Sequence, residues 1–300
     1  MPDKFIVSKN HNKSRFDKWF KKEVLDLPNS LIQKLLRKNK IKVNNKRIKS
    51  SFRLTEGDVI LIFNLSNFKP TDFKKKIQYL PSDSEKKRLE NFVIYNDSDY
   101  IVINKPRGIA VQSGTNNLKN IVDTLKKTKY FENSKPYIVH RLDKETSGIF
   151  LIAKNRESAQ FFTSLFRIRK IHKTYLAVVK GEVPRTLKKM EDILEYFEKN
   201  KKTKLKAITF LKVLKSNNKY SLLELNPRTG RKHQLRKQWY MRGFPIIGDQ
   251  KYSIKQNKIN KQQKMLLHSS KIKFIKNDKK FSFIAETDSE FEKKLNLYFR

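Results

Sequence analysis

The sequence predicts an α+β protein in two parts, and three observations carry that prediction. Residues 14–63 combine two amphipathic helical patterns with short apolar runs that suit a small hairpin. Residues 64–90 lose this periodicity and contain Pro70, Pro81 and a run of lysines. From Phe92 onward, short β-branched and aromatic runs recur between polar turns, with a few helical patterns among them. A length of 300 residues agrees with two domains.

The charge of the chain points to a polyanionic partner. Lys and Arg number 69 against 29 Asp and Glu, a formal net charge of +40. A compositional bias toward Lys and Asn would raise this charge too, but it does not readily explain so few acids. No stretch approaches ~18 consecutive apolar residues, so nucleic acid is favoured over membrane. The first residues lack the apolar core of a signal peptide, which favours the cytoplasm.

Several kinds of chemistry find no support in the residues. The chain has no cysteine, which excludes disulfides, thiolate catalysis and zinc held by cysteine. Its five histidines show no metal-binding spacing, and no glycine-rich nucleotide loop is present. We therefore expect neither a cofactor nor a metal.

The N-terminal segment carries an unusual run of cations. Its second helical pattern and the hairpin that follows contain eight cations and no acid between positions 34 and 49. A charge run is usually a solvated face, but this one exceeds what solvation requires. Two helices, then Val43-Asn44-Asn45-Lys46-Arg47-Ile48, then Gly57-Asp58-Val59-Ile60 resemble an S4 domain, a module that grips structured RNA. The residues that we assign to RNA binding here are Lys34, Arg37, Lys38, Lys46 and Arg47.

We set the domain boundaries from these patterns. The S4 domain should span residues 1–66, a basic linker 67–90 and a catalytic domain 91–300. Within the catalytic domain, we expect helices at about 118–127 and 156–169. A third should end at about Met241, and a fourth should begin at about Ser289. Residues 185–205 are interpreted as a helix or a surface insertion, and 255–264 as a polar loop. Strands are expected at 92–95, 100–103, 137–139, 149–153, 173–179, 207–214, 220–225, 271–275 and 281–284.

One polar loop, His140 to Gly148, lies between two of these strands. Its carboxylate Asp143 sits between Arg141 and Lys144, and cations so close favour the ionised form. That environment suits a nucleophile or an electrostatic stabiliser better than a general acid. Taken alone, however, an aspartate between strands is more often a turn former.

A second functional stretch runs from Pro227 to Arg236. A glycine turn that opens a helix makes an anion site, and Arg228, Arg231 and Arg236 are placed to use it. Arg231 and Arg236 are five residues apart and need not share a face, so they can serve different targets. The alternative interpretation is an ordinary basic surface helix.

Four motifs taken together resemble the RluA family of pseudouridine synthases. They are His-Arg-Leu-Asp-Lys-Glu-Thr-Ser-Gly at 140–148, Lys-Thr-Tyr-Leu-Ala at 173–177, Arg-Thr-Gly-Arg-Lys-His-Gln-Leu-Arg at 228–236, and Leu-Leu-His at 266–268. The resemblance covers about 92–300. With the S4-like unit in front, it is greatest to the branch that modifies large-subunit ribosomal RNA (RluC type).

This resemblance implies a fold and a reaction. The fold would be a mixed, mostly antiparallel central sheet with flanking helices and an active-site cleft. The reaction would isomerise uridine to pseudouridine in 23S ribosomal RNA, without a cofactor and with one protein copy. Asp143 would act at the ribose, as nucleophile at C1′ or as base at C2′. Tyr175 would stack on the uracil and could relay a proton.

The resemblance also assigns the surrounding residues. Arg236 would hold Asp143 ionised, with Arg231 as a close rival, and His140 would pack the loop. Two departures stand out: Lys237-Gln238 replaces the usual Val-His, and Arg107 occupies a variable position. The residues that we assign to substrate or RNA binding in this domain are Arg141, Lys173, Arg228, Arg231, His233, Gln234 and Leu267.

Overall fold

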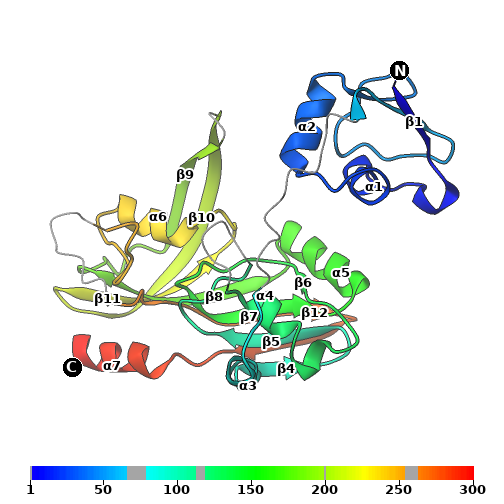
Figure 1. The fold of residues 1–300 in the computed structure, drawn as a ribbon. Helices are drawn as coiled ribbons and strands as arrows, with labels where there is room; N and C mark the ends of the chain where they lie inside the picture. Colours follow the sequence, from blue (N-terminus) through cyan, green and yellow to red (C-terminus); the bar gives the residue numbers. More distant parts are fainter. Residues whose placement is uncertain (1, 66–78, 113–118, 199–200, 254–262) are drawn as a thin grey trace. The chain divides into compact units, whose positions relative to one another are not determined.

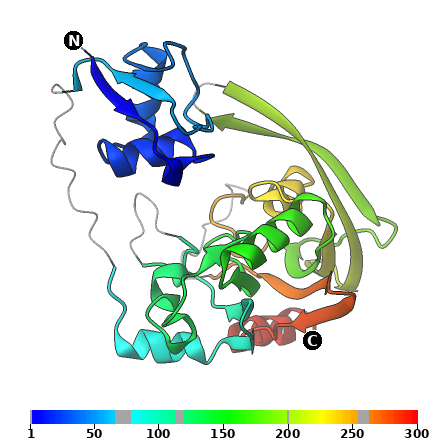
Figure 2. The same ribbon diagram turned by 90° about the vertical axis from the view of Figure 1, so that its right-hand side faces the viewer.

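The computed structural model divides the chain into two compact units, Met1–Gln78 and Tyr79–Arg300 (Figures 1 and 2). It describes residues 2–65, 79–112, 119–198, 201–253 and 263–300. The polar loop expected at 255–264 lies almost entirely outside the described residues. Among the described residues, no helix is long and apolar enough to cross a bilayer.

The first unit packs two helices against a small antiparallel sheet. Strand β1 (Asp3–Ile6) was not predicted, and it pairs with β3 (Val59–Ile62), which also pairs with β2 (Ile41–Val43). A 3-10 turn (Lys9–His11) precedes helix α1 (Phe16–Glu23), and α2 (Asn29–Arg37) follows. The N-cap residue of α1 is Arg15, which makes no side-chain cap bond. The apolar stripes of both helices enter the core as predicted, with Phe16, Phe20 and Ile32 fully buried.

The cations expected to bind RNA in this unit lie on its surface. Lys34, Arg37 and Lys38 are exposed at the end of α2, and Lys46 and Arg47 are exposed in the turn after β2. The Arg47 guanidinium donates to the Arg37 carbonyl over 3.1 Å, which ties the two segments together. None of the five has a carboxylate partner within the part of the chain that the structure describes.

The second unit is built on a mixed, mostly antiparallel sheet of ten strands, as predicted. Its main path runs β4-β5-β7-β12-β8-β11-β10-β9, with β6 paired to β7 and β13 to β12. Only β7 and β12 pair in parallel among the described strands. The strands are β4 (Val93–Asn96), β5 (Tyr100–Lys105), β6 (Tyr137–Ile138), β7 (Ser147–Ala153), β8 (His172–Lys180), β9 (Lys189–Glu198), β10 (Lys201–Ser216), β11 (Tyr220–Pro227), β12 (Leu267–Lys276) and β13 (Lys279–Ile284).

Helices cover both faces of this sheet because its strands alternate two apolar sets. Ile101 and Phe150 belong to one core, and their neighbours Tyr100 and Leu151 belong to the opposite one. The first face packs against α3 (Asp83–Glu90), α4 (Ile121–Leu125), the short 3-10 helix Lys129–Phe131 and α6 (Gln234–Met241). The other face packs against α5 (Arg156–Arg167) and α7 (Ser289–Tyr298).

One prediction of secondary structure was wrong. Residues 185–205, expected as helix or insertion, contribute β9 and the start of β10, a long hairpin that rises beside α6 (Figure 1). Its charges neutralise one another across the strands, as in the Lys202–Glu195 pair at 2.8 Å. The last part of the expected linker forms α3. A reciprocal capping box between Ser82 and Glu85 starts that helix.

Gly148 permits the close approach of the two parallel strands. Its φ is +104°, and a Cβ there would lie 2.2 Å from the Ser269 carbonyl oxygen on β12. We expect Gly148→Ala to lower the free energy of unfolding by about 3 kcal/mol, because the backbone of Ser269 cannot move aside as a side chain could. Gly243→Ala is the control: φ is +79°, but nothing lies within 4 Å of the added Cβ. Equal losses in urea denaturation would refute the close-approach explanation.

Candidate active site

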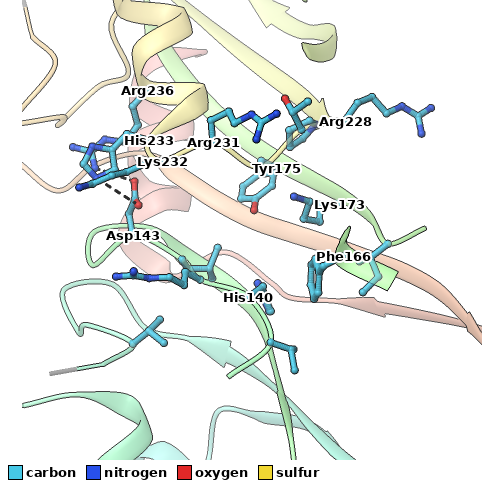
Figure 3. A pocket seen from close by; sticks show the side chains of 18 of the residues that line it. His140, Asp143, Phe166, Lys173, Tyr175, Arg228, Arg231, Lys232, His233 and Arg236 are labelled. Carbon is cyan, nitrogen blue, oxygen red and sulfur yellow. Dashed lines mark hydrogen bonds and ion pairs between the residues drawn. The ribbon is translucent and has the colours of Figure 1, made fainter. Parts of the chain in front are cut away.

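A cavity of about 1130 Å³ opens in the second unit where the predicted motifs converge (Figure 3). Its walls are the loop before β7, the end of α5, the first half of β8 and the turn between β11 and α6. Asp143 lines this cavity together with Tyr175 and Arg236, so residues far apart in sequence meet at one place.

Asp143 is paired with Arg236, not with Arg231. The Arg236 Nη1 donates to Asp143 Oδ2 over 3.0 Å, and the carboxylate keeps 27% of its side-chain surface exposed. The Arg231 Nε instead donates to the Lys206 carbonyl over 3.0 Å, which fastens the turn to β10. Asp143 is therefore held by a cation and still open to a ligand.

A second carboxylate fixes the guanidinium of Arg236. Asp249 accepts from Arg236 Nε over 2.7 Å and from Nη2 over 2.8 Å, and its side chain is fully buried. Burial opposes the charge on Arg236, but the bonds to Asp249 and Asp143 raise its pKa above the ordinary value. Burial likewise opposes the charge on Asp249, while Arg236 holds the pKa of that carboxyl below its usual range. Arg236 thus stays charged and oriented between two acids.

Tyr252 and His233 complete the surroundings of this pair. The Tyr252 ring lies 5.2 Å from the Arg236 guanidinium, and its hydroxyl lies 2.9 Å from His233 Nδ1. His233 adopts a left-handed conformation, φ 52°, that carries its Nε2 to 3.7 Å from Asp143 Oδ1. Burial lowers the pKa of His233, although the Asp143 carboxylate opposes the shift. His233 therefore borders the Asp143 carboxylate as a ring whose neutral form is favoured by burial.

Sequence reasoning missed Asp249 and Tyr252. Nothing local in the sequence shows that Asp249 reaches back 13 residues to Arg236. The available signal was an acid following a glycine turn in a basic chain, which is weak by itself.

Tyr175 lies on β8 and faces the pocket (Figure 3). Only 9% of its surface is exposed. Burial raises its pKa to about 12, the Asp143 charge adds to that shift, and a hydrogen bond from Ser269 opposes it. The phenol therefore keeps its proton at neutral pH, and an aromatic edge lies beside the carboxylate.

The loop that carries Asp143 is fastened through its backbone. The buried ammonium of Lys105 donates to the carbonyls of Pro106, Ile109 and Lys144 at 2.9, 2.9 and 3.1 Å. Gly108 N–H donates to the same Lys144 carbonyl over 2.9 Å. Because Lys144 follows Asp143 directly, these bonds limit how far the carboxylate can move.

His140 packs the loop, as its sequence context suggested. Its ring stacks on Phe166 with centroids 4.7 Å apart, and its Nε2 accepts from the Leu151 N–H over 2.9 Å. Burial is the main cause that lowers its pKa to about 3. The ring is therefore neutral and serves as an acceptor.

The low pKa of the partly buried His140 ring predicts an acid sensitivity. Between pH 6.5 and about 3, only the unfolded chain protonates this ring. The free energy of unfolding should therefore decrease as the pH decreases, by up to about 1.4 kcal/mol per pH unit. His140→Gln keeps an acceptor but does not titrate. We expect the variant to be less stable at pH 7 and its deficit to shrink as the pH falls to 4, measured by urea denaturation. A deficit that stays constant over this range would contradict the assignment.

The turn before α6 is held by an internal amide network. Gln234 Oε1 accepts from Thr229 Oγ1 over 2.7 Å and from Arg231 N–H over 3.1 Å, so this side chain braces the turn. Gln238, at a position where the family commonly has His, accepts from Thr209 at 2.7 Å and donates to Asp192 at 2.7 Å. It therefore buttresses α6 against the hairpin.

The remaining assigned residues differ in their exposure. Arg141 and Arg228 are exposed at the pocket, Lys173 lines it, and Leu267 is buried behind it. Arg228 Nη1 lies 3.2 Å from His172 Nδ1. Within the described ranges, no three carboxylate or imidazole side chains come together as a metal site would require.

A cavity on a mixed sheet thus brings together a carboxylate, its arginine and a buried tyrosine. The RNA pseudouridylate synthase family matches residues 99–239, and the S4 domain family matches 3–60. The chain belongs to the RNA pseudouridine synthases, the isomerases that convert uridine to pseudouridine in RNA.

The similar proteins cover nearly the whole chain. Ribosomal large subunit pseudouridine synthase C of Rickettsia bellii is 38% identical over 86% of this chain and 89% of its own. The protein of that name from Buchnera aphidicola of Schizaphis graminum is 32% identical over 94% and 93%. Human RNA pseudouridylate synthase domain containing 4 superposes with a TM-score of 0.60 at 25% identity, over 70% of this chain and 94% of that one.

Proposed function

We propose that the chain isomerises specific uridines in large-subunit ribosomal RNA, with Asp143 acting at the ribose and without a cofactor. The observation that carries this proposal is the ion pair of Asp143 and Arg236 at 3.0 Å, set beside Tyr175 in the main cavity. The choice of RNA follows the names of the relatives, which act on the large ribosomal subunit.

The chemistry asks little of the protein beyond these groups. The N1–C1′ bond of uridine breaks, the uracil turns, and C5 joins C1′; the C5 proton leaves and N1 ends protonated. Asp143 serves either by attacking C1′ or by removing the C2′ proton, and both routes need an ionised carboxylate. Arg236 keeps it ionised and aimed. The reaction has no net redox change, so no electron carrier is required.

The uracil must leave its helix before this reaction. Unstacking a base costs a few kcal/mol, which contacts in the pocket must offset. Tyr175 offers the aromatic surface for the displaced base. Arg141 is exposed two residues before Asp143, where it can fill the vacated stack or hold a phosphate.

The S4 unit supplies a second RNA-binding surface. Lys34, Arg37, Lys38, Lys46 and Arg47 form one exposed basic group without acids nearby in sequence. Removing residues 1–66 should weaken binding to large-subunit ribosomal RNA and flatten its salt dependence, since each lost phosphate contact lowers the slope by about 0.7–0.9. The measurement is affinity from 50 to 300 mM KCl. An unchanged slope would remove the role proposed for this unit.

The choice of RNA is tested with purified protein. We expect pseudouridine to form in transcripts of large-subunit ribosomal RNA and not in transfer RNA or small-subunit RNA. Conversion of transfer RNA alone would support the proposed reaction but contradict the proposed substrate. Binding without conversion of any RNA would favour a ribosome assembly factor. We further expect the enzyme to act in the cytoplasm. We also expect one copy to suffice, because Asp143, Tyr175 and Arg236 all come from one chain.

A further inference from the structure

Lys173 is a mostly buried lysine whose ammonium has no protein partner among the described residues. It lies on β8 two positions before Tyr175, so both side chains project from the same face of the strand into the cavity. Figure 3 shows it beside Tyr175, on the side away from Asp143. A partly buried ammonium that lines a cavity and has no protein partner is free to pair with a ligand.

A second buried lysine shows what pairing looks like in this chain. The ammonium of Lys105 is satisfied by three carbonyls at 2.9 to 3.1 Å. For Lys173, no hydrogen bond or ion pair exists within the described part of the chain. Burial alone lowers its pKa, and no carboxylate offsets that effect. The ammonium of Lys173 is therefore left without a protein partner in the described ranges, at a position that the cavity reaches.

The turn above Lys173 leaves its ammonium accessible. Gly230 lies over it, and a Cβ added there would come to 3.8 Å from Lys173 Nζ. The backbone does not require glycine here, since the φ of Gly230 is outside the left-handed region. A side chain at this position would cover the ammonium from the cavity side. The absence of a side chain keeps a path from the cavity to the charge.

The surroundings select an anion as the ligand. Arg167, Arg169 and Arg228 line the same end of the cavity and are exposed there. Arg228 is held over Phe210 at 5.5 Å and beside His172, so its charge is positioned at the rim. A neutral uracil carbonyl would need one donor, whereas several neighbouring cations suit a phosphate.

We propose that Lys173, under Gly230, is the inner residue of a phosphate subsite that takes the RNA phosphodiester next to the target uridine. This inference rests on the proposed function, because Tyr175 must hold the uracil for Lys173 to meet the neighbouring phosphate. The rim arginines then continue along the same strand of RNA.

Lys173→Met separates this role from a structural one. Removing a partly buried charge that has no protein partner should leave the melting temperature of the free protein unchanged or raise it. The same variant should raise KM for large-subunit ribosomal RNA about tenfold and lower the salt slope by about one. Lys180→Met is the matched control, an exposed lysine at the far end of β8, and should change neither quantity.

A chemical substitution in the RNA identifies the contact. A substrate fragment receives one uncharged methylphosphonate at either linkage flanking the target uridine. At one of the two positions, the methylphosphonate should raise the KM of the wild type about tenfold. It should not raise the KM of Lys173→Met any further. A lower kcat with unchanged salt slope and no such coupling would overturn the phosphate subsite. Failure of wild type to convert the unmodified fragment would instead count against the proposed function.

Discussion

Asp143→Asn should reduce pseudouridine formation by at least about 10⁴-fold, because loss of a reacting carboxylate is among the largest single effects in enzymes. RNA affinity should stay the same or increase slightly, since the change removes a negative charge that faces phosphates. The fold should be kept, because Asn fits the same volume and can still accept from Arg236. Single-turnover conversion of rRNA, with affinity measured in parallel, checks both halves.

A matched variant guards this experiment against a general effect of charge. Glu145→Gln removes a carboxylate that lines the same cavity two residues further along the loop. We expect that variant to keep its rate within about threefold, as for a group that does not react. If both variants lose activity equally, or if Asp143→Asn converts RNA at the wild-type rate, Asp143 does not act at the ribose.

Arg236→Gln should cost both folding stability and activity. Asp249 would keep a fully buried carboxylate without its bidentate partner, which we expect to cost about 3–5 kcal/mol. Asp143 would lose the cation that holds it, so the rate should fall about 10³-fold even at temperatures where the variant is folded. Urea denaturation and single-turnover rates measure the two losses separately.

The double variant Arg236→Gln with Asp249→Asn distinguishes the two roles. It removes the unpaired buried charge, and the new amide can still accept from the Lys251 and Tyr252 N–H groups at 2.9 and 3.0 Å. We expect most of the lost stability to return and the rate to stay low. If activity returned with stability, Arg236 would act only by holding the fold together.

The sequence predicted the parts of the site that short local patterns carry. Asp143 stands in a long motif between two apolar runs, and the β8 strand and α6 helix follow from ordinary periodicity, so their residues could be assigned. The choice between Arg231 and Arg236 could not be made. It depends on how the turn folds onto β10, where Arg231 meets the Lys206 carbonyl.

What the sequence could not predict depends on contacts between distant segments. The β9–β10 hairpin was mistaken for a helix or insertion because its lysines and glutamates obscure the period of two. Its buried residues Met190 and Leu194 lie four positions apart, a spacing that also suits a helix face. The sequence also does not show that Lys173 lacks a protein partner, because this depends on which acids fail to reach it in the fold. The mixed sheet was predicted only through the family resemblance, because strand spacing alone does not define strand order.

The central claim is that this chain makes pseudouridine in large-subunit ribosomal RNA through Asp143. Site-resolved pseudouridine mapping of that RNA tests it most directly, in a strain that lacks the chain and is complemented with wild type or Asp143→Asn. We predict that specific sites disappear on deletion, return with wild type, and stay absent with Asp143→Asn at equal protein levels. An unchanged map on deletion, or sites restored by Asp143→Asn, would contradict this account.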